Sequence, residues 1–313
     1  MLSYNKNLKK KSVNYNLIST PNVELLNHLI QQKKYPQALD VASKITNLYP
    51  NDEENLIKLS FILYELKNFK KALLIINKIL ELKPRNFNIL RNKALIYEKL
   101  LNYEKAIEIY NNCLFLEPKN VDIFNSIAVL LFKLGNIKQS IITLKKALNI
   151  NPNSSEVLVN YGTILNEIGE TDVAIKILEK TLKINPNNYL AKKNLAIAFK
   201  NKGEFLISIE LFKKILKINP DDFEANNILG IIYYNMGHEE KAKLHYCQAM
   251  KIDKSSHLTY WNLYGLSESL NEAREYLNKC LFTNKDFIQA KLTLAALDYY
   301  ENKKLQYNEL IKS

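Results

Sequence analysis

Apolar residues along most of the chain recur at helical spacing, in short segments separated by polar turns. In the middle of the chain, Leu158, Gly162 and Leu165 fall on one face of an expected helix. A second expected helix follows, with Ala174 and Leu178 on its apolar face. Glycine (7) and proline (8) are too scarce for a turn-rich all-β fold. The pattern predicts an all-α protein made of helical hairpins.

The hairpin pattern repeats every 34 residues. Six of the eight prolines stand at this interval: Pro50, Pro84, Pro118, Pro152, Pro186 and Pro220. With this proline numbered as position 32, the successive units begin at Ser19, Glu53, Phe87, Val121, Ser155, Tyr189 and Phe223. One hairpin cannot bury both of its apolar stripes, whereas stacked neighbours bury them between each other.

Three further positions of the repeat support this register. Position 20 is always small: Ala38, Ala72, Ala106, Ser140, Ala174, Ser208 and Ala242. Position 8 is mostly small: Leu26, Ser60, Ala94, Ala128, Gly162, Ala196 and Gly230. Position 34 is always a good helix N-cap: Asp52, Asn86, Asn120, Ser154, Asn188, Asp222 and Ser256. We therefore expect helices to approach closely at the small positions and to begin directly after each position 34.

These residues resemble the tetratricopeptide repeat (TPR) family in period, small positions and proline. The resemblance implies a right-handed α-solenoid of about eight to nine hairpins, with seven contiguous units over 19–256. Residues 257–285 look like a degenerate eighth unit with a shortened turn. Residues 286–313 look like a partial repeat followed by a short capping helix. Residues 1–18 carry only positive side-chain charge and are expected to be a disordered tail.

The net charge of +12 raises the question of nucleic acid, but the basic residues argue against it. Only Arg85, Arg91 and Arg274 are arginine, the residue preferred for base-edge and bidentate phosphate contacts. Nucleic-acid binding is therefore not expected. No apolar segment approaches the roughly 20 residues of a membrane span, and the cysteines form no disulfide framework. A cytoplasmic protein is expected.

No constellation of residues predicts catalysis, a metal site or a cofactor. His238 and His245 lie two helical turns apart, but Cys247 is expected to point elsewhere. Cys113 and Cys280 occupy a small packing position of the repeat and are expected in the core. No glycine-rich phosphate loop occurs. We therefore expect a protein that is not an enzyme and that needs no cofactor.

In the TPR family the first helices of the hairpins line a concave groove, and position 6 faces it. That position reads Glu24, Lys58, Asn92, Ser126, Asn160, Asn194, Ile228 and, if the register holds, Asn262. In the superhelix of O-linked N-acetylglucosamine transferase, asparagines at this place bind the backbone of extended peptides. The resemblance implies the same role for the four asparagines, because an amide both donates and accepts. The alternative is that asparagine is merely frequent at this position.

Four other residues complete the predicted partner-binding set: Arg91, Phe132, Lys193 and Tyr234. Positions 9 and 12 mix apolar, aromatic and polar side chains, which suits an extended segment or a helix with apolar anchors. The Lys and Asn pattern of the TPR clamp for chaperone C-terminal tails is missing. We predict an adaptor or scaffold that binds a protein or peptide. The alternative is a substrate-recognition arm for a glycosyl-, sulfo- or methyltransferase whose catalytic domain is absent from this chain.

Overall fold

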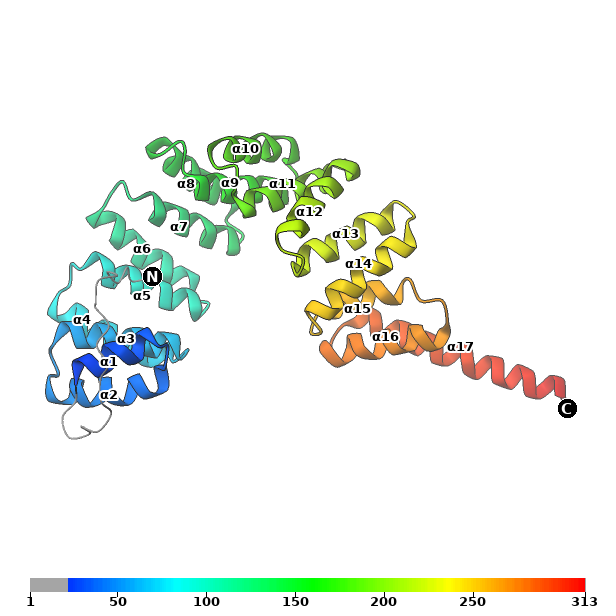
Figure 1. The fold of residues 1–313 in the computed structure, drawn as a ribbon, viewed down its shortest axis with the longest axis horizontal. Helices are drawn as coiled ribbons and strands as arrows, with labels where there is room; N and C mark the ends of the chain where they lie inside the picture. The colour runs from blue at the N-terminus through cyan, green and yellow to red at the C-terminus, as the bar shows by residue number, and fades with distance from the viewer. Residues whose placement is uncertain (1–21, 313) are drawn as a thin grey trace. The chain divides into compact units, whose positions relative to one another are not determined.

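The computed structural model describes residues 22–312 and the side chains as far as residue 303. Within that range the chain forms 17 helices and no strand (Figure 1). The prediction of an all-α solenoid of TPR hairpins is confirmed. The predicted basic tail at residues 1–18 lies outside the described residues. Contacts divide the chain into two compact units, 1–157 and 158–313, called here unit 1 and unit 2.

Unit 1 consists of hairpins in which each helix packs on its neighbours in sequence. Its helices are α1 (Val23–Gln31), α2 (Tyr35–Leu48), α3 (Glu53–Glu65), α4 (Phe69–Leu82), α5 (Phe87–Lys99), α6 (Tyr103–Leu116), α7 (Val121–Lys133) and α8 (Ile137–Ile150). The first residues of α9 (Ser155–Glu167) close the unit. Apolar side chains from consecutive helices merge into continuous core clusters, as stacking of hairpins requires.

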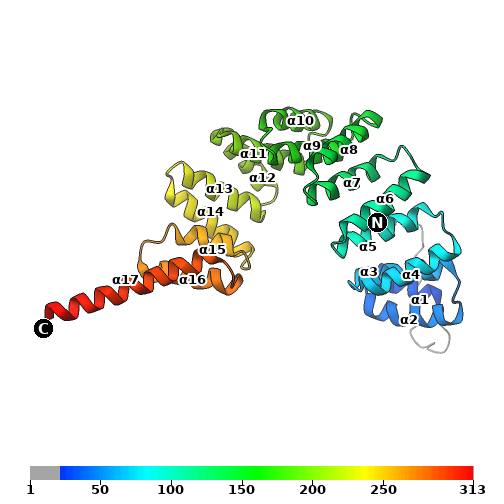
Figure 2. The ribbon, with the colours of Figure 1, turned by 180° about the vertical axis from the view of Figure 1, so that it is seen from behind.

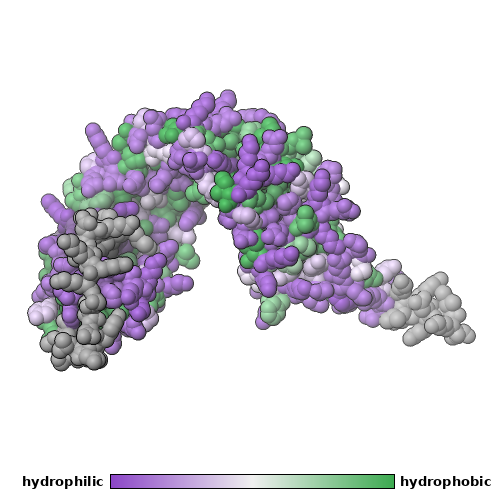
Figure 3. All heavy atoms as spheres, in the orientation of Figure 1, coloured by the Kyte–Doolittle hydropathy of each residue, from purple (hydrophilic) through white to green (hydrophobic). Residues whose placement is uncertain are grey.

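Unit 2 holds the rest of α9 and continues the same alternation of first and second helices (Figure 2). Its other helices are α10 (Thr171–Ile184), α11 (Tyr189–Lys202), α12 (Phe205–Ile218), α13 (Phe223–Asn235), α14 (Glu239–Ile252), α15 (His257–Tyr264), α16 (Leu270–Thr283) and α17 (Ile288–Lys312). No helix described between residues 22 and 312 is long and apolar enough to cross a membrane. On the face shown in Figure 3, hydrophilic residues predominate and apolar ones form small patches between them.

The small residues at position 8 are explained by close packing inside each hairpin. A Cβ atom on Gly162 would lie 2.8 Å from Cγ of Leu178, and one on Gly230 would lie 2.5 Å from the Tyr246 ring. Where position 20 is serine, its hydroxyl is satisfied across the same contact. Ser208, for example, donates to the carbonyl oxygen of Ala196 over 2.7 Å. The predicted close approach is confirmed.

Six of the seven predicted N-caps form. The side chains of Asp52, Asn86, Asn120, Asn188, Asp222 and Ser256 each accept a hydrogen bond from a backbone amide in the first turn of the next helix. Each bond satisfies an amide that has no partner inside its helix. Position 34 therefore fixes where each first helix begins.

The C-terminal end departs from the regular repeat. Helix α15 has only 8 residues, whereas the regular first helices α3, α5, α7 and α13 each have 13. After α16, the helix α17 runs without a break over 25 residues. The expectation of a first helix followed by a separate capping helix is therefore wrong. The segment from Ile288 to Lys312 contains no proline or glycine that would end a helix between the two parts.

Candidate partner-binding face

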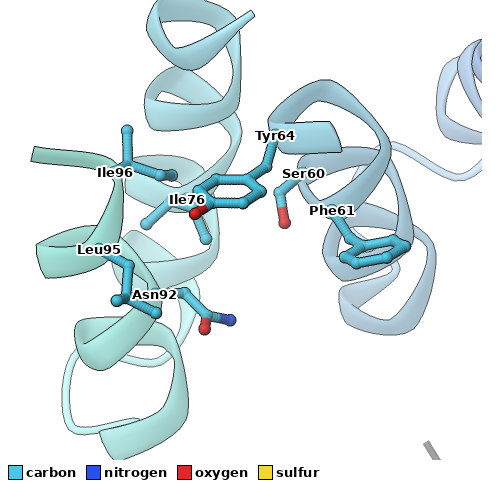
Figure 4. A pocket seen from close by; sticks show the side chains of 7 residues that line it. All are labelled: Ser60, Phe61, Tyr64, Ile76, Asn92, Leu95 and Ile96. Carbon is cyan, nitrogen blue, oxygen red and sulfur yellow. The ribbon is translucent and has the colours of Figure 1, made fainter. Parts of the chain in front are cut away.

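Each first helix keeps one face that is not used for stacking, and in unit 1 this face contains a small cavity. The cavity, called here the slot, is a shallow recess with a volume of about 30 Å³ that opens to solvent. Its lining comes from α3, α4 and α5: Ser60, Phe61, Tyr64, Ile76, Asn92, Leu95 and Ile96. In Figure 4 Tyr64 of α3 and Asn92 and Ile96 of α5 extend toward the space between the two helices, whereas the ring of Phe61 points away from α5.

The aromatic walls of the slot are held by ring contacts with neighbouring helices. Phe61 lies edge-on to Tyr35, with ring centroids 6.0 Å apart, and Tyr64 lies edge-on to Phe69 at 5.5 Å. Such contacts restrict the rings to one orientation. The amide of Asn92 adds a donor and an acceptor to otherwise apolar walls (Figure 4). The slot therefore combines an apolar recess with a group that can bind a peptide unit.

Charged groups surround the slot on both sides. Lys58, at position 6 of α3, is only 2 % exposed, and its Nζ lies 2.6 Å from Oε1 of Glu54. Glu98 of α5 accepts a 2.6 Å hydrogen bond from the hydroxyl of Tyr110. Burial, followed by Glu65 and Glu98, raises the pKa of Tyr64, so this hydroxyl stays protonated at the slot.

The charge of Arg91 acts on α6, whereas the next residue, Asn92, lines the slot. Burial and then Glu98 raise the pKa of Tyr110, and the positive charge of Arg91 opposes them. Burial raises the pKa of Cys113 to about 11, again opposed by Arg91. Tyr110 and Cys113 are both on α6, so the charge of Arg91 acts on side chains of that helix.

In unit 2 one of the predicted asparagines, Asn194, forms a hydrogen bond with a neighbouring first helix. Nδ2 of Asn194 on α11 donates to Oγ1 of Thr163 on α9 over 2.7 Å. Thr163 in turn donates to the carbonyl oxygen of Val159 over 2.9 Å. Asn160 is half-buried on α9, three residues before Thr163. The amide of Asn194 is therefore partly used in joining two adjacent first helices.

Lys193, the residue before Asn194, belongs to a partly buried ionic network that joins α11 to the start of α13. Its Nζ lies 3.1 Å from Oδ2 of Asp222 and 2.7 Å from Oε2 of Glu224. Tyr189 donates to the same Asp222 carboxylate, which also accepts from the amide of Ala225. Burial by itself would raise the pKa of Asp222. Its hydrogen-bond partners and the charge of Lys193 outweigh burial, so the pKa is lowered and the carboxylate stays charged. The network was not predicted, although its residues stand at repeat positions 1, 2, 5 and 34.

The other predicted residues each lie on the first helix of their own hairpin. Phe132 is half-buried on α7, Tyr234 is exposed on α13, and Asn262 is half-buried on the short α15. Beside Asn262, the ring of Trp261 lies 5.3 Å from that of Phe287. Tyr64 and Phe61 were not part of the predicted set. Their repeat positions, 12 and 9, are among the groove positions of the first helix, and this was the sequence feature that could have identified them.

The residues considered for metal binding have packing roles. Cys113 and Cys280 are buried, which confirms their prediction as core residues. His245 stacks on Tyr233 with centroids 5.5 Å apart, and burial lowers its pKa, which favours the neutral ring. In the part of the chain that the structure describes, no group of three or more His, Cys, Asp or Glu residues could hold a metal ion.

Family models match the repeats. One tetratricopeptide repeat model matches residues 121–154 and 155–188. A second tetratricopeptide repeat model matches residues 211–243. The model for anaphase-promoting complex, cyclosome, subunit 3 matches residues 31–113. The chain is a tetratricopeptide repeat protein. No curated protein sequence matches it significantly.

Several solved structures share the fold of this TPR protein. A tetratricopeptide repeat protein from Parabacteroides merdae is 19 % identical, with a TM-score of 0.65 over 78 % of this chain and 98 % of that one. PilW, a type IV pilus biogenesis factor, is 21 % identical, with a TM-score of 0.60 over 67 % and 98 %. The human IFIT1 dimer with PPP-AAAA is 16 % identical, with a TM-score of 0.63 over 91 % and 74 %. At these identities the likeness shows the fold alone.

Proposed function

We propose that this TPR protein is an adaptor or assembly scaffold that binds an extended segment of a protein partner along its first helices. The slot of unit 1 takes an apolar side chain of that segment, and Asn92 holds the neighbouring peptide unit. The observation that carries the proposal is the slot itself, because its walls are aromatic and aliphatic and its polar group suits a backbone. The proposal requires no cofactor and no catalytic residue.

The same first-helix face would also bind the substrate segment in the alternative function, in which the chain is a recognition arm for a transferase. Both functions require an extended protein segment on the first helices. They differ in the second partner, because only the arm would associate with a separate transferase chain. The slot supports segment binding and does not favour one of the two.

A peptide library tests the proposal. Peptides selected on the full chain from a random displayed library should contain an apolar anchor residue. Leu95→Trp places a larger side chain at the slot and should weaken the selected peptides by at least roughly tenfold. Val129→Trp is the matched control, since Val129 has the same repeat position on α7 and does not line the slot. Equal binding by the wild type and Leu95→Trp would refute the slot as the anchor site.

A further inference from the structure

Helix α17 has one covered side and one uncovered apolar side. It packs on α16 through Ala290, Leu294 and Leu297. Arg274 of α16 forms ion pairs with Asp298 and Glu301 and so holds the same side. The other side is exposed and contains Ile288 (65 %), Leu292 (67 %), Ala295, Ala296, Tyr299 (68 %) and Lys303. This uncovered side is called here the α17 stripe.

The register of α17 explains why the stripe is uncovered. Helix α17 begins four residues after the C-cap Asn284, just as α11 begins four residues after the C-cap Asn185. Ala295 therefore corresponds to position 8, which is fully buried in Ala94, Ala128 and Ala196. In those hairpins a second helix packs on the alanine. On α17, by contrast, Ala295 and the adjacent Ala296 are exposed.

The spacing of the stripe reads the same from both ends. From Ile288 to Lys303 the steps are four, three, one, three and four residues, and the midpoint lies between Ala295 and Ala296. Large side chains stand on both sides of two small ones. We propose that the α17 stripe binds the α17 stripe of a second copy of this chain, with the two helices antiparallel. A twofold axis at the midpoint then places Leu292 against the partner's Tyr299.

Physical chemistry favours this occupant over an unrelated helix. The contact is isologous, so each copy supplies both halves of a self-complementary surface. The paired alanines let the helix axes approach closely at the crossing point. Antiparallel helices also set the opposite ends of their dipoles side by side. The same rotation brings Lys291 to the partner's Tyr300, an arrangement suited to a cation–π contact.

The free end of α17 leaves room for a second copy. Figures 1 and 2 show α17 continuing well beyond the end of α16, within unit 2. The stripe lies partly on this projecting portion, where no other described helix packs on it. A contact of a single helix pair is small compared with a stable interface, so the dimer should depend on concentration. The inference stands apart from the proposed function, which concerns the slot of unit 1.

Sedimentation of the full chain over about 1 to 100 µM tests the proposal. The dimer fraction should rise with concentration. Leu292→Lys and Tyr299→Lys should each weaken dimerisation by at least roughly tenfold, because each change enters the interface twice. Leu244→Lys is the control, since Leu244 is equally exposed on α14 of the same unit. A monomer at every concentration, or a dimer insensitive to both α17 changes, would overturn the proposal.

Cross-linking tests the orientation and does not depend on disruptive variants. In a Cys247→Ser background, chains with Leu292→Cys are mixed with chains with Tyr299→Cys and oxidised. A disulfide should form between the two different variants. Efficient cross-linking of Leu292→Cys chains with each other would instead indicate parallel helices and overturn the antiparallel pairing.

Discussion

The first-helix faces of the two units use the same repeat positions in different ways. In unit 1, Asn92 borders an apolar slot whose walls come from Phe61 and Tyr64. In unit 2, Asn194 at the same position donates to Thr163, and Lys193 is held by Asp222. A position in the repeat therefore tells where a side chain stands. Whether it is available to a partner depends on the residue that the next repeat places against it.

The hairpin turns of the two units also differ. In unit 2 the turn residues Gly169, Gly203 and Gly237 have φ between 75° and 88°. In unit 1 three of the corresponding residues, Lys33, Lys67 and Leu101, also have positive φ, between 56° and 58°, and the fourth is Gly135 with φ 77°. A side chain makes this conformation unfavourable, whereas glycine adopts it freely. Three turns of unit 1 therefore tolerate backbone strain that the glycine turns of both units avoid.

The largest expected difference between the units is in the N-caps at position 34. Asp222→Ala removes a cap, worth about 1 kcal/mol, and leaves the half-buried Lys193 with one fewer partner, worth about 1–3 kcal/mol. Urea unfolding should show a loss of roughly 2–4 kcal/mol. Asp52→Ala at the same position of unit 1, where the exposed carboxylate caps α3 through the amide of Asn55, should cost only about 1 kcal/mol. Equal losses would show that the ionic network adds nothing to the cap.

The Asp222 network also predicts an acid dependence. The pKa of Asp222 is lowered in the folded protein, so its contribution is complete above the ordinary value of about 4 and is lost as pH falls through the lower folded value. Asp222→Asn keeps a cap but removes the charge. The stability advantage of the wild type over Asp222→Asn should shrink below about pH 4. An advantage that persists unchanged at pH 2–3 would contradict the assignment.

Asn92→Ala should weaken selected peptides by roughly 3–10-fold, the value of one amide hydrogen bond. Stability should hardly change, because alanine is the better helix former. Fluorescence anisotropy with a labelled peptide measures the effect. Ser126→Ala, at the same position of α7, is the matched control and should bind as the wild type does.

In unit 2 the equivalent asparagine should act on stability instead. Asn194→Ala and Thr163→Val remove the two ends of one hydrogen bond between adjacent first helices. A double-mutant cycle in urea should give a coupling of about 0.5–1.5 kcal/mol. Zero coupling would show that the bond contributes nothing and that unit 2 is as open to a partner as unit 1.

The smallest expected effect concerns the strained turns. Leu101→Gly relieves an unfavourable φ but makes the unfolded chain more flexible, so a net gain of up to about 1 kcal/mol is expected. Gly169→Ala should have the opposite effect and lower the free energy of unfolding by about 1 kcal/mol. Thermal unfolding of the two variants measures both signs. A loss of stability on Leu101→Gly would show that the turn of unit 1 is not strained.

Much of the fold could be predicted from the sequence, because it depends on local features that recur. The proline interval, the small residues at position 8 and the caps at position 34 each act within one hairpin or between two neighbours. The slot could not be predicted, because Phe61 and Tyr64 are oriented by Tyr35 and Phe69 on other helices. Similarly, the role of Lys193 depends on a carboxylate 29 residues away in the next hairpin.

The most direct test of the central claim is to map where a peptide's apolar anchor lies. A selected peptide is synthesised with a photoreactive leucine at its anchor position, bound to the unmodified full chain, irradiated and analysed by mass spectrometry. The account predicts cross-links to residues of α3 and α5, above all Phe61, Tyr64 and Leu95. Cross-links confined to the first helices of unit 2, α11 and α13, would contradict it.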